Sequence, residues 1–375
     1  MKRWLIALVL LVAVAACARV MPPPGGVRDT EPPRIVRTDP EQNSNATQHA
    51  GTRRPVRIVF HETVSERSPR ELVQVSPETG EVDVDRDGEE LRVTIGGGWQ
   101  PGRVYRVTVL PGIVDRMGNA RPTAYELVFS TGGAILPNAL GGLATDRITG
   151  RPVAAGRVEA IARADSTVYT TVTDSAGFFS MRSLPAGIYD TRIYVDQNRN
   201  RALDAFEARA TSQFTIAPND TLALELAVLV PDTTAARLVR ADGRDSLQVA
   251  LVFDDYMDPP AGPLNIRVVA WQLPDSTQIV GGMVMTPRAF RATRPDTTRV
   301  TPPGLAAPTD TAAALPINEL IWVPPRPLRP TTRYRVTATG YRNLHGLPNG
   351  GGSVVFTMPA PPRVAPAAPR DTTRR

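Results

Sequence analysis

The chain has 375 residues with a formal net charge of +6, 37 prolines, 29 glycines and a single cysteine. A single cysteine excludes an intramolecular disulfide, and basic residues scattered among acidic ones argue against a nucleic-acid partner. Many turn-forming residues together with only 9 Phe and 4 Trp indicate an all-β protein with modest cores. The length predicts two or three domains.

Residues 1–16 have the pattern of a secretory signal peptide. Lys2 and Arg3 precede an apolar run that is shorter than the roughly 20 residues needed to span a bilayer. The run closes in Ala-Ala-Cys17, which resembles the bacterial lipobox and implies that Cys17 is acylated and becomes the new N-terminus. The alternative is a plain signal peptide followed by an incidental cysteine. We expect lipidation, because this cysteine has no disulfide partner, and we expect residues 17–33 to form a lipidated tether.

Two distant parts of the chain repeat one pattern of short alternating runs separated by Pro, Gly and Asn turns. This pattern predicts an antiparallel β-sandwich in each part. The separation between matching residues is shorter at the start of the repeat than in its middle, so the second copy contains an insertion. We place this insertion at about residues 286–316 and expect it to be an irregular loop or disordered. The matching pairs are Phe60 and Phe253, Tyr105 and Tyr334, and Phe129 and Phe356.

Short motifs mark the first copy, residues 34–132. They are Phe60-x-Glu62-x-Val64, Pro101-Gly102-x-x-Tyr105, Asp115-x-x-Gly118-Asn119 and the closing Phe129-Ser130-Thr131. Together they resemble the bacterial Ig-like domain of S-layer and cell-surface proteins, which implies a β-sandwich. The second copy, residues 235–358, lacks the Asp-x-x-Gly-Asn turn, so its assignment as an Ig-like domain depends on the repeat.

The segment between the copies, residues 135–230, has a different set of turns. They contain Gly150, Gly177 and Gly187, and glycine permits the positive φ that such turns require. Their order and spacing resemble the carboxypeptidase regulatory-like domain, which implies a small transthyretin-like sandwich. Beyond the second copy, residues 359–375 are rich in Pro, Ala and Arg without periodicity, and we expect a disordered tail.

A polar stretch in the middle module has the ligand spacing of an EF-hand calcium loop, with oxygen donors at positions 1, 3, 5, 7, 9 and 12. Position 6 holds Arg201 where such loops have glycine, which strains the turn and places a cation nearby. The alternative is a polar turn whose Asp and Asn side chains cap their own backbone. We expect a structural calcium site, with Ala202 contributing its carbonyl oxygen. The predicted ligands are Asp196, Asn198, Asn200, Ala202, Asp204 and Glu207.

Other candidate residues favour structural interpretations. His49, His61 and His345 have no metal-ligand spacing, and Glu62 and Asp255 recur at equivalent positions, which is typical of hydrogen bonding at a sandwich edge. No nucleophile elbow, P-loop or dinucleotide motif is present in the sequence. The three tryptophans after the signal peptide adjoin predicted strands, and we expect them to be core residues. They are Trp99, Trp271 and Trp322.

These observations predict three tandem β-sandwiches in a non-catalytic envelope protein, exported and held by a lipid anchor. Ala18, rather than aspartate, follows the acylated cysteine, which favours the outer membrane in proteobacterial-type sorting. The sandwiches would serve binding, adhesion or scaffolding, with an envelope protein or a glycan as partner. One alternative is a polysaccharide-binding accessory lipoprotein. The other, a transthyretin-like hydrolase, conflicts with the absence of histidine from residues 135–230.

Overall fold

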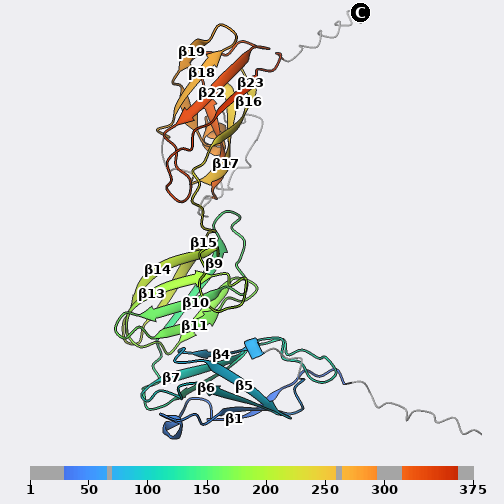
Figure 1. Cartoon of the computed structure of the whole chain (residues 1–375), viewed down its shortest axis with the longest axis vertical. Coiled ribbons are helices and arrows are strands. Elements are labelled where there is room, and N and C mark those ends of the chain that lie inside the picture. Colours follow the sequence, from blue (N-terminus) through green and yellow to red (C-terminus); the bar gives the residue numbers. More distant parts are fainter. Residues whose placement is uncertain (1–28, 66–69, 259–263, 294–314, 362–375) are drawn as a thin grey trace, which may run out of the picture. The chain divides into compact units, whose positions relative to one another are not determined.

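A computed structural model describes residues 29–65, 70–258, 264–293 and 315–361 (Figure 1). The chain divides into two units, Met1–Ile135 and Leu136–Arg375. The predicted signal peptide, Cys17 and residues 17–28 of the predicted tether lie outside the described residues, as does the tail from residue 362. The described parts consist mainly of antiparallel sheets packed face to face, so the predicted all-β class with tandem β-sandwiches is confirmed.

The first unit is a sandwich in which β3 shows the alternating burial of a strand with one face in a core. In β3 the side chains of Val56, Ile58 and Phe60 are buried, which is the period of two expected for a strand with one face in a core. One sheet contains, in spatial order, β1 (Ile35–Asp39), β3 (Val56–Phe60), β6 (Glu90–Ile95) and β5 (Val82–Asp87). The other contains β2 (Ser44–Asn45), β8 (Tyr125–Ser130), β7 (Val104–Val109) and β4 (Val73–Ser76), with short 3-10 turns η1 (Thr47–His49) and η2 (Arg70–Leu72).

The middle module has its own core between two sheets of different size. Tyr189 and Phe214 stack within this core, with ring centroids 5.0 Å apart. The larger sheet contains β11 (Val168–Val172), β10 (Arg157–Ala162), β13 (Gly187–Tyr194) and β14 (Arg209–Ile216). The smaller contains β12 (Phe178–Arg182), β9 (Ala139–Asp146) and β15 (Thr221–Val228), in which β15 runs parallel to β9.

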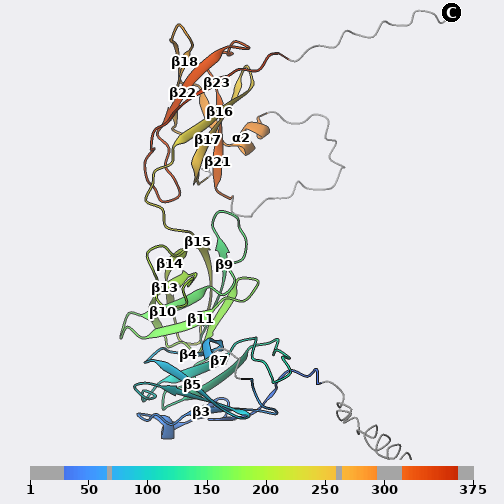
Figure 2. The same ribbon diagram turned by 45° about the vertical axis from the view of Figure 1, so that its right-hand side comes forward.

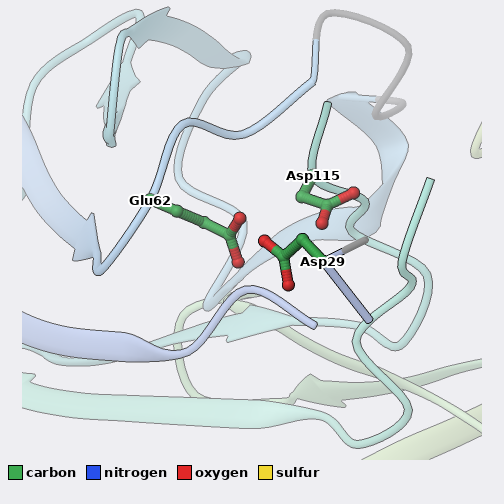
Figure 3. Close-up of side chains that lie close together, drawn as sticks. All are labelled: Asp29, Glu62 and Asp115. Atoms are coloured by element: carbon green, nitrogen blue, oxygen red, sulfur yellow. The ribbon is translucent and has the colours of Figure 1, made fainter. Parts of the chain in front are cut away.

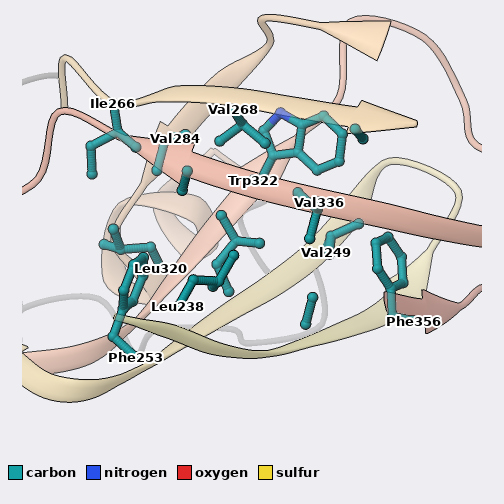
Figure 4. Packing of buried hydrophobic residues seen from close by; sticks show 14 of the residues in the cluster. Leu238, Val249, Phe253, Ile266, Val268, Val284, Leu320, Trp322, Val336 and Phe356 are labelled. Carbon is teal, nitrogen blue, oxygen red and sulfur yellow. The ribbon is translucent and has the colours of Figure 1, made fainter. Parts of the chain in front are cut away.

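The C-terminal sandwich encloses a third core, in which Trp322 and Phe253 are fully buried (Figure 4). One sheet contains β16 (Leu238–Asp245), β17 (Gln248–Met257), β21 (Ile317–Val323) and β20 (Met283–Met285). The other contains β19 (Thr277–Val280), β18 (Arg267–Gln272), β22 (Arg333–Thr339) and β23 (Ser353–Thr357).

The first and the C-terminal sandwich share one strand order, as the sequence repeat predicts. The sheet β1-β3-β6-β5 corresponds to β16-β17-β21-β20, and β8-β7-β4 corresponds to β23-β22-β18. The matching tyrosines are buried and use their hydroxyl groups alike. The Tyr105 hydroxyl accepts the backbone N–H of Gln100 at 2.8 Å, and the Tyr334 hydroxyl accepts that of Arg329 at 2.9 Å. The start of the equivalent strand is therefore held by the same tyrosine hydrogen bond in both sandwiches.

The start of the predicted disordered insertion is ordered, so the expectation for residues 286–316 is wrong there. Residues Pro287–Ala292 form the helix α2, which lies beside β21 (Figure 2). The Thr286 hydroxyl caps this helix by accepting the Ala289 N–H at 3.0 Å, and proline occupies its first turn. Phe290 packs against Ala250 and Ile321, and this apolar burial holds the helix on the sheet. Residues 294–314 lie outside the described part of the chain.

Candidate functional site

The predicted lipidation site cannot be placed, because Cys17 lies outside the described residues. In the part of the chain that is described, no helix is long and apolar enough to cross a membrane.

The predicted calcium loop joins β13 to β14 and is closed by its own hydrogen bonds. Asp196 accepts the backbone N–H groups of Asn200 and Arg201, at 3.1 and 2.8 Å. The side-chain amides of Asn198 and Asn200 both donate to Oδ2 of Asp204, at 2.7 and 3.0 Å. These contacts draw four of the six predicted ligand residues around one turn.

Glu207 fastens the two ends of this loop. Its Oε1 accepts the N–H of Gln197 at 2.9 Å, and its Oε2 accepts the N–H of Asp204 at 3.0 Å. The side chain is fully buried. Both oxygens that a bidentate calcium ligand would offer are therefore used by the backbone, which is the arrangement of the alternative interpretation, a self-capped polar turn.

The sixth position of the loop adopts the backbone conformation that the calcium spacing requires. Arg201 has a φ of 60° and Arg199 a φ of 59°, both in the left-handed region where glycine is the usual residue. Each arginine therefore adds conformational strain. The carbonyl oxygen of Arg201 lies 3.0 Å from the hydroxyl of Tyr194, which anchors the strained turn to β13.

A buried ionic network lies on the strands beneath this turn. Glu159 accepts the Nε–H of Arg157 at 2.8 Å, that of Arg192 at 2.6 Å and the Tyr194 hydroxyl at 2.8 Å. Burial would raise the pKa of Glu159, but the hydrogen bonds from Arg157, Tyr194 and Arg192 outweigh it and hold the pKa below its usual value. Glu159 is therefore ionised at neutral pH, and its charge is balanced by two guanidinium groups.

Three carboxylates of the first sandwich point toward one another (Figure 3). One oxygen from each of Asp29, Glu62 and Asp115 lies within 4.8 Å of the other two. Asp29 precedes β1, Glu62 follows β3, and Asp115 is in the turn between β7 and β8. No local sequence pattern groups these residues, because they are far apart in the chain. The recurrence of an acid at Glu62 and Asp255 was the available signal.

The surroundings of the cluster shift the pKa values of Glu62 and Asp115 in opposite directions. Burial raises the pKa of Glu62, His61 lowers it, and Asp115 and Asp29 raise it. Burial would also raise the pKa of Asp115, but hydrogen bonds from Asn119 outweigh this effect and lower it. Carboxylate oxygens of this kind bind Ca²⁺ or Mg²⁺. Repulsion among the three carboxylates can be relieved either by such an ion or by a proton on Glu62.

The second sandwich replaces one of these carboxylates with an amide. Asn343 occupies the turn position that Asp115 has in the first copy, and its Nδ2 donates to Oδ2 of Asp255 at 2.8 Å. Asp255 itself corresponds to Glu62. The hydrogen bonding expected at Asp255 is therefore present, whereas Glu62 faces two other acids.

The remaining candidates are dispersed. His49 is buried in η1, with its ring centroid 6.0 Å from that of Phe129, and burial lowers the pKa of His49. His61 lies next to Glu62, with Nε2 3.4 Å from Oε1, and His345 is exposed.

The predicted core position of the tryptophans holds for two of three. Trp99 and Trp322 are fully buried, but Trp271 is partly exposed. Its neighbours Val268 and Ala270 point into the core, so the alternation of β18 places Trp271 on the outer face.

Comparison with protein families identifies two modules. Residues 29–131 match the model of the bacterial Ig-like domain, and residues 139–229 match that of the carboxypeptidase regulatory-like domain. No curated protein matches the chain.

Several solved structures are similar over long stretches but at low identity. A DUF3823 family protein from Bacteroides uniformis is 10% identical, with 59% of this chain and 99% of that chain covered and a TM-score of 0.18. A variant of BcpA, the major pilin subunit of Bacillus cereus, is 12% identical over 52% and 71% of the two chains, with a TM-score of 0.18. Part of α2-macroglobulin from Escherichia coli is 11% identical over 87% and 97%, with a TM-score of 0.21. TM-scores this low carry no functional argument.

Proposed function

We propose that the protein is a non-catalytic component of a bacterial envelope, anchored through lipid on Cys17, whose β-sandwiches present binding surfaces away from the membrane. The observation that carries this proposal is the N-terminal pattern, in which a charged start and a short apolar run end in Ala-Ala-Cys17. Durable anchoring requires more than one acyl chain, and lipoprotein processing supplies several.

The modules that follow support a binding role. Residues 29–131 and 139–229 match an Ig-like and a regulatory-like family model, neither of which is a catalytic family. The modules occur in tandem after Pro- and Gly-rich residues, an arrangement suited to holding surfaces at a distance from an anchor. Outer-membrane placement is part of the proposal, because Ala18 follows the acylated residue.

A structural calcium ion in the 196–207 loop is a second part of the proposal. The left-handed backbone at Arg201 and the convergence of Asn198 and Asn200 on Asp204 support it. Asp196, Asn198, Asn200, Asp204 and Glu207 would hold the ion together with the carbonyl oxygen of Ala202. Calcium would replace the hydrogen bonds that now close the loop.

The anchor is tested by expressing the full chain in a proteobacterial host alongside Cys17→Ser and Ala18→Asp variants. We expect the unaltered chain to incorporate labelled fatty acid and to fractionate with the outer membrane. Cys17→Ser should lose the label, and Ala18→Asp should keep the label but move to the inner membrane. Equal labelling of the unaltered chain and Cys17→Ser would refute the anchor.

A further inference from the structure

The outer face of the sheet β19-β18-β22-β23 has an unusual composition for a solvent-exposed surface. Figure 1 labels the four strands. None of them, all within the described residues, contains an acidic residue, whereas β18 and β22 contribute three arginines. The arginines are Arg267, Arg333 and Arg335, and all three side chains are exposed. The face is therefore positively charged, without an acid of its own sheet to neutralise it.

Trp271 lies in the middle of this face. It is paired with Gln278 on β19 and with Arg335 on β22, and Arg335 is in turn paired with Val355 on β23. Among the described residues the indole N–H of Trp271 has no protein acceptor, unlike that of Trp322, which donates to the Gly281 carbonyl at 2.8 Å. A partly exposed aromatic ring with a free donor is thus flanked by an amide and a guanidinium.

In the first sandwich, the arginine at the corresponding position is neutralised by a carboxylate. Arg106 corresponds to Arg335, since each follows the matching tyrosine, and its Nε lies 3.0 Å from Oε1 of Glu126 on β8. Glu126 is paired with Thr108, and the corresponding partner of Thr337 in the second copy is Ser353. The second copy therefore has serine where the first has the carboxylate, and it has Trp271 where the first has Ser76.

We propose that this face binds an acidic polysaccharide. The indole would pack against the apolar face of a sugar ring, and guanidinium groups would bind the sugar carboxylates through paired hydrogen bonds. Gln278, Thr337 and Ser353 supply side-chain donors and acceptors for hydroxyl groups. The inference deepens the proposed function by naming a partner class, and it rests on that function only in assuming an envelope setting.

The composition favours a polysaccharide over other polyanions. Single-stranded nucleic acid is bound by successive aromatic platforms, and this face has one. A membrane surface is bound by large protruding apolar side chains, whereas the exposed apolar side chains of this face are the short Val280 and Val355, and Trp271 is half-buried within the sheet.

Binding is measured with the full-length Cys17→Ser chain, which makes the result independent of the anchor. The probes are polygalacturonate and alginate, with methyl-esterified polygalacturonate as a ligand of the same backbone without the charge. We expect both acidic polymers to bind, the ester to bind about tenfold more weakly, and affinity to fall as salt rises from about 0.02 M to about 0.5 M. Failure of both acidic polymers to bind would overturn the proposal, as would binding only to phosphatidylglycerol vesicles.

Variants taken from the first copy locate the site. Trp271→Ser removes the ring, and Ser353→Glu places a carboxylate beside Arg335 as Glu126 stands beside Arg106. Each should weaken polygalacturonate binding by about tenfold or more, with an unchanged melting temperature. Arg240→Ala, on the opposite sheet, should bind like the parent chain. Parental affinity in both Trp271→Ser and Ser353→Glu would overturn the assignment of this face.

Loss of binding in these variants says nothing of fatty-acid labelling at Cys17, and failure of labelling leaves the binding measurement intact. The two proposals can therefore fail separately.

Discussion

The hydroxyl of Tyr194 lies 2.8 Å from Oε1 of Glu159 and 3.0 Å from the carbonyl oxygen of Arg201. One buried residue thus connects the ionic network on β10 and β13 to the middle of the 196–207 loop. Burial and the bond to Glu159 raise the pKa of Tyr194, so its hydroxyl stays protonated over the working pH range.

Tyr194→Phe should destabilise the middle module and loosen the loop. The variant keeps the ring but removes the single hydroxyl proton that Glu159 and the Arg201 carbonyl share, so we expect a loss of about 1–2 kcal/mol in the free energy of unfolding. Denaturant unfolding measures the loss, and hydrogen exchange of residues 196–207 reports the loosening. Unchanged stability together with unchanged exchange would contradict the role assigned to Tyr194.

Arg201→Gly should stabilise the module, because glycine adopts the left-handed conformation without the steric cost that arginine incurs. The expected gain is about 0.5–1 kcal/mol in the free energy of unfolding. Ala202→Gly is the matched control, since Ala202 has no positive φ and glycine there should destabilise by about 0.5–1 kcal/mol. If both variants shifted stability in the same direction, the strain at Arg201 would not be the cause.

Calcium should raise the melting temperature of the chain if the loop binds it. Extracellular modules bind calcium weakly, with dissociation constants on the order of 10⁻⁴–10⁻³ M, so the titration must reach millimolar concentrations. Arg201→Gly should strengthen the response by removing a nearby cation. Asp196→Ala should abolish it. A melting temperature that neither calcium nor chelator moves, in the unaltered chain and in Asp196→Ala alike, would rule out the site.

Glu62→Gln should stabilise the first sandwich at neutral pH. The pKa of Glu62 is raised in the folded state, mainly by burial, so the folded state binds its proton more tightly than the unfolded state does. Ionised Glu62 therefore costs stability once the pH rises through its folded pKa. The advantage of the glutamine variant should disappear below the ordinary value of 4.5.

Thermal unfolding of Glu62→Gln and the unaltered chain between about pH 3.5 and pH 7.5 tests this dependence. Asp255→Asn in the second sandwich is the control, because Asp255 is bonded to an amide rather than to other acids. A stability difference for Glu62→Gln that grows as the pH falls would contradict the raised pKa.

Much of the fold can be predicted from local sequence patterns. The matching Tyr105 and Tyr334, each at the start of an alternating run, predict two equivalent strand entries, and the structure contains both with the same hydroxyl bond. The calcium-type spacing likewise predicts a strained turn at position 6, where arginine stands in place of glycine, and Arg201 has a φ of 60°.

Other features depend on contacts that no local pattern reveals. The run Arg-Val-Val-Ala-Trp-Gln of β18 is nearly continuous in apolar residues, so the outward direction of Trp271 is decided only by its register with β22. The helix α2 is short, and what orders it is the packing of Phe290 against Ala250 and Ile321, which are distant in the sequence. The acidic cluster joins residues that are far apart in the chain, since Asp29 precedes β1, Glu62 follows β3 and Asp115 lies between β7 and β8.

The proposed function requires that Cys17 carry the lipid anchor of the mature protein. This is tested by mass spectrometry of the N-terminal peptide, from protein extracted with detergent out of the producing cells. We expect a mature chain that begins at Cys17 and bears diacylglycerol-type acyl mass on that residue. A mature chain that begins elsewhere, or an unmodified Cys17, would contradict it.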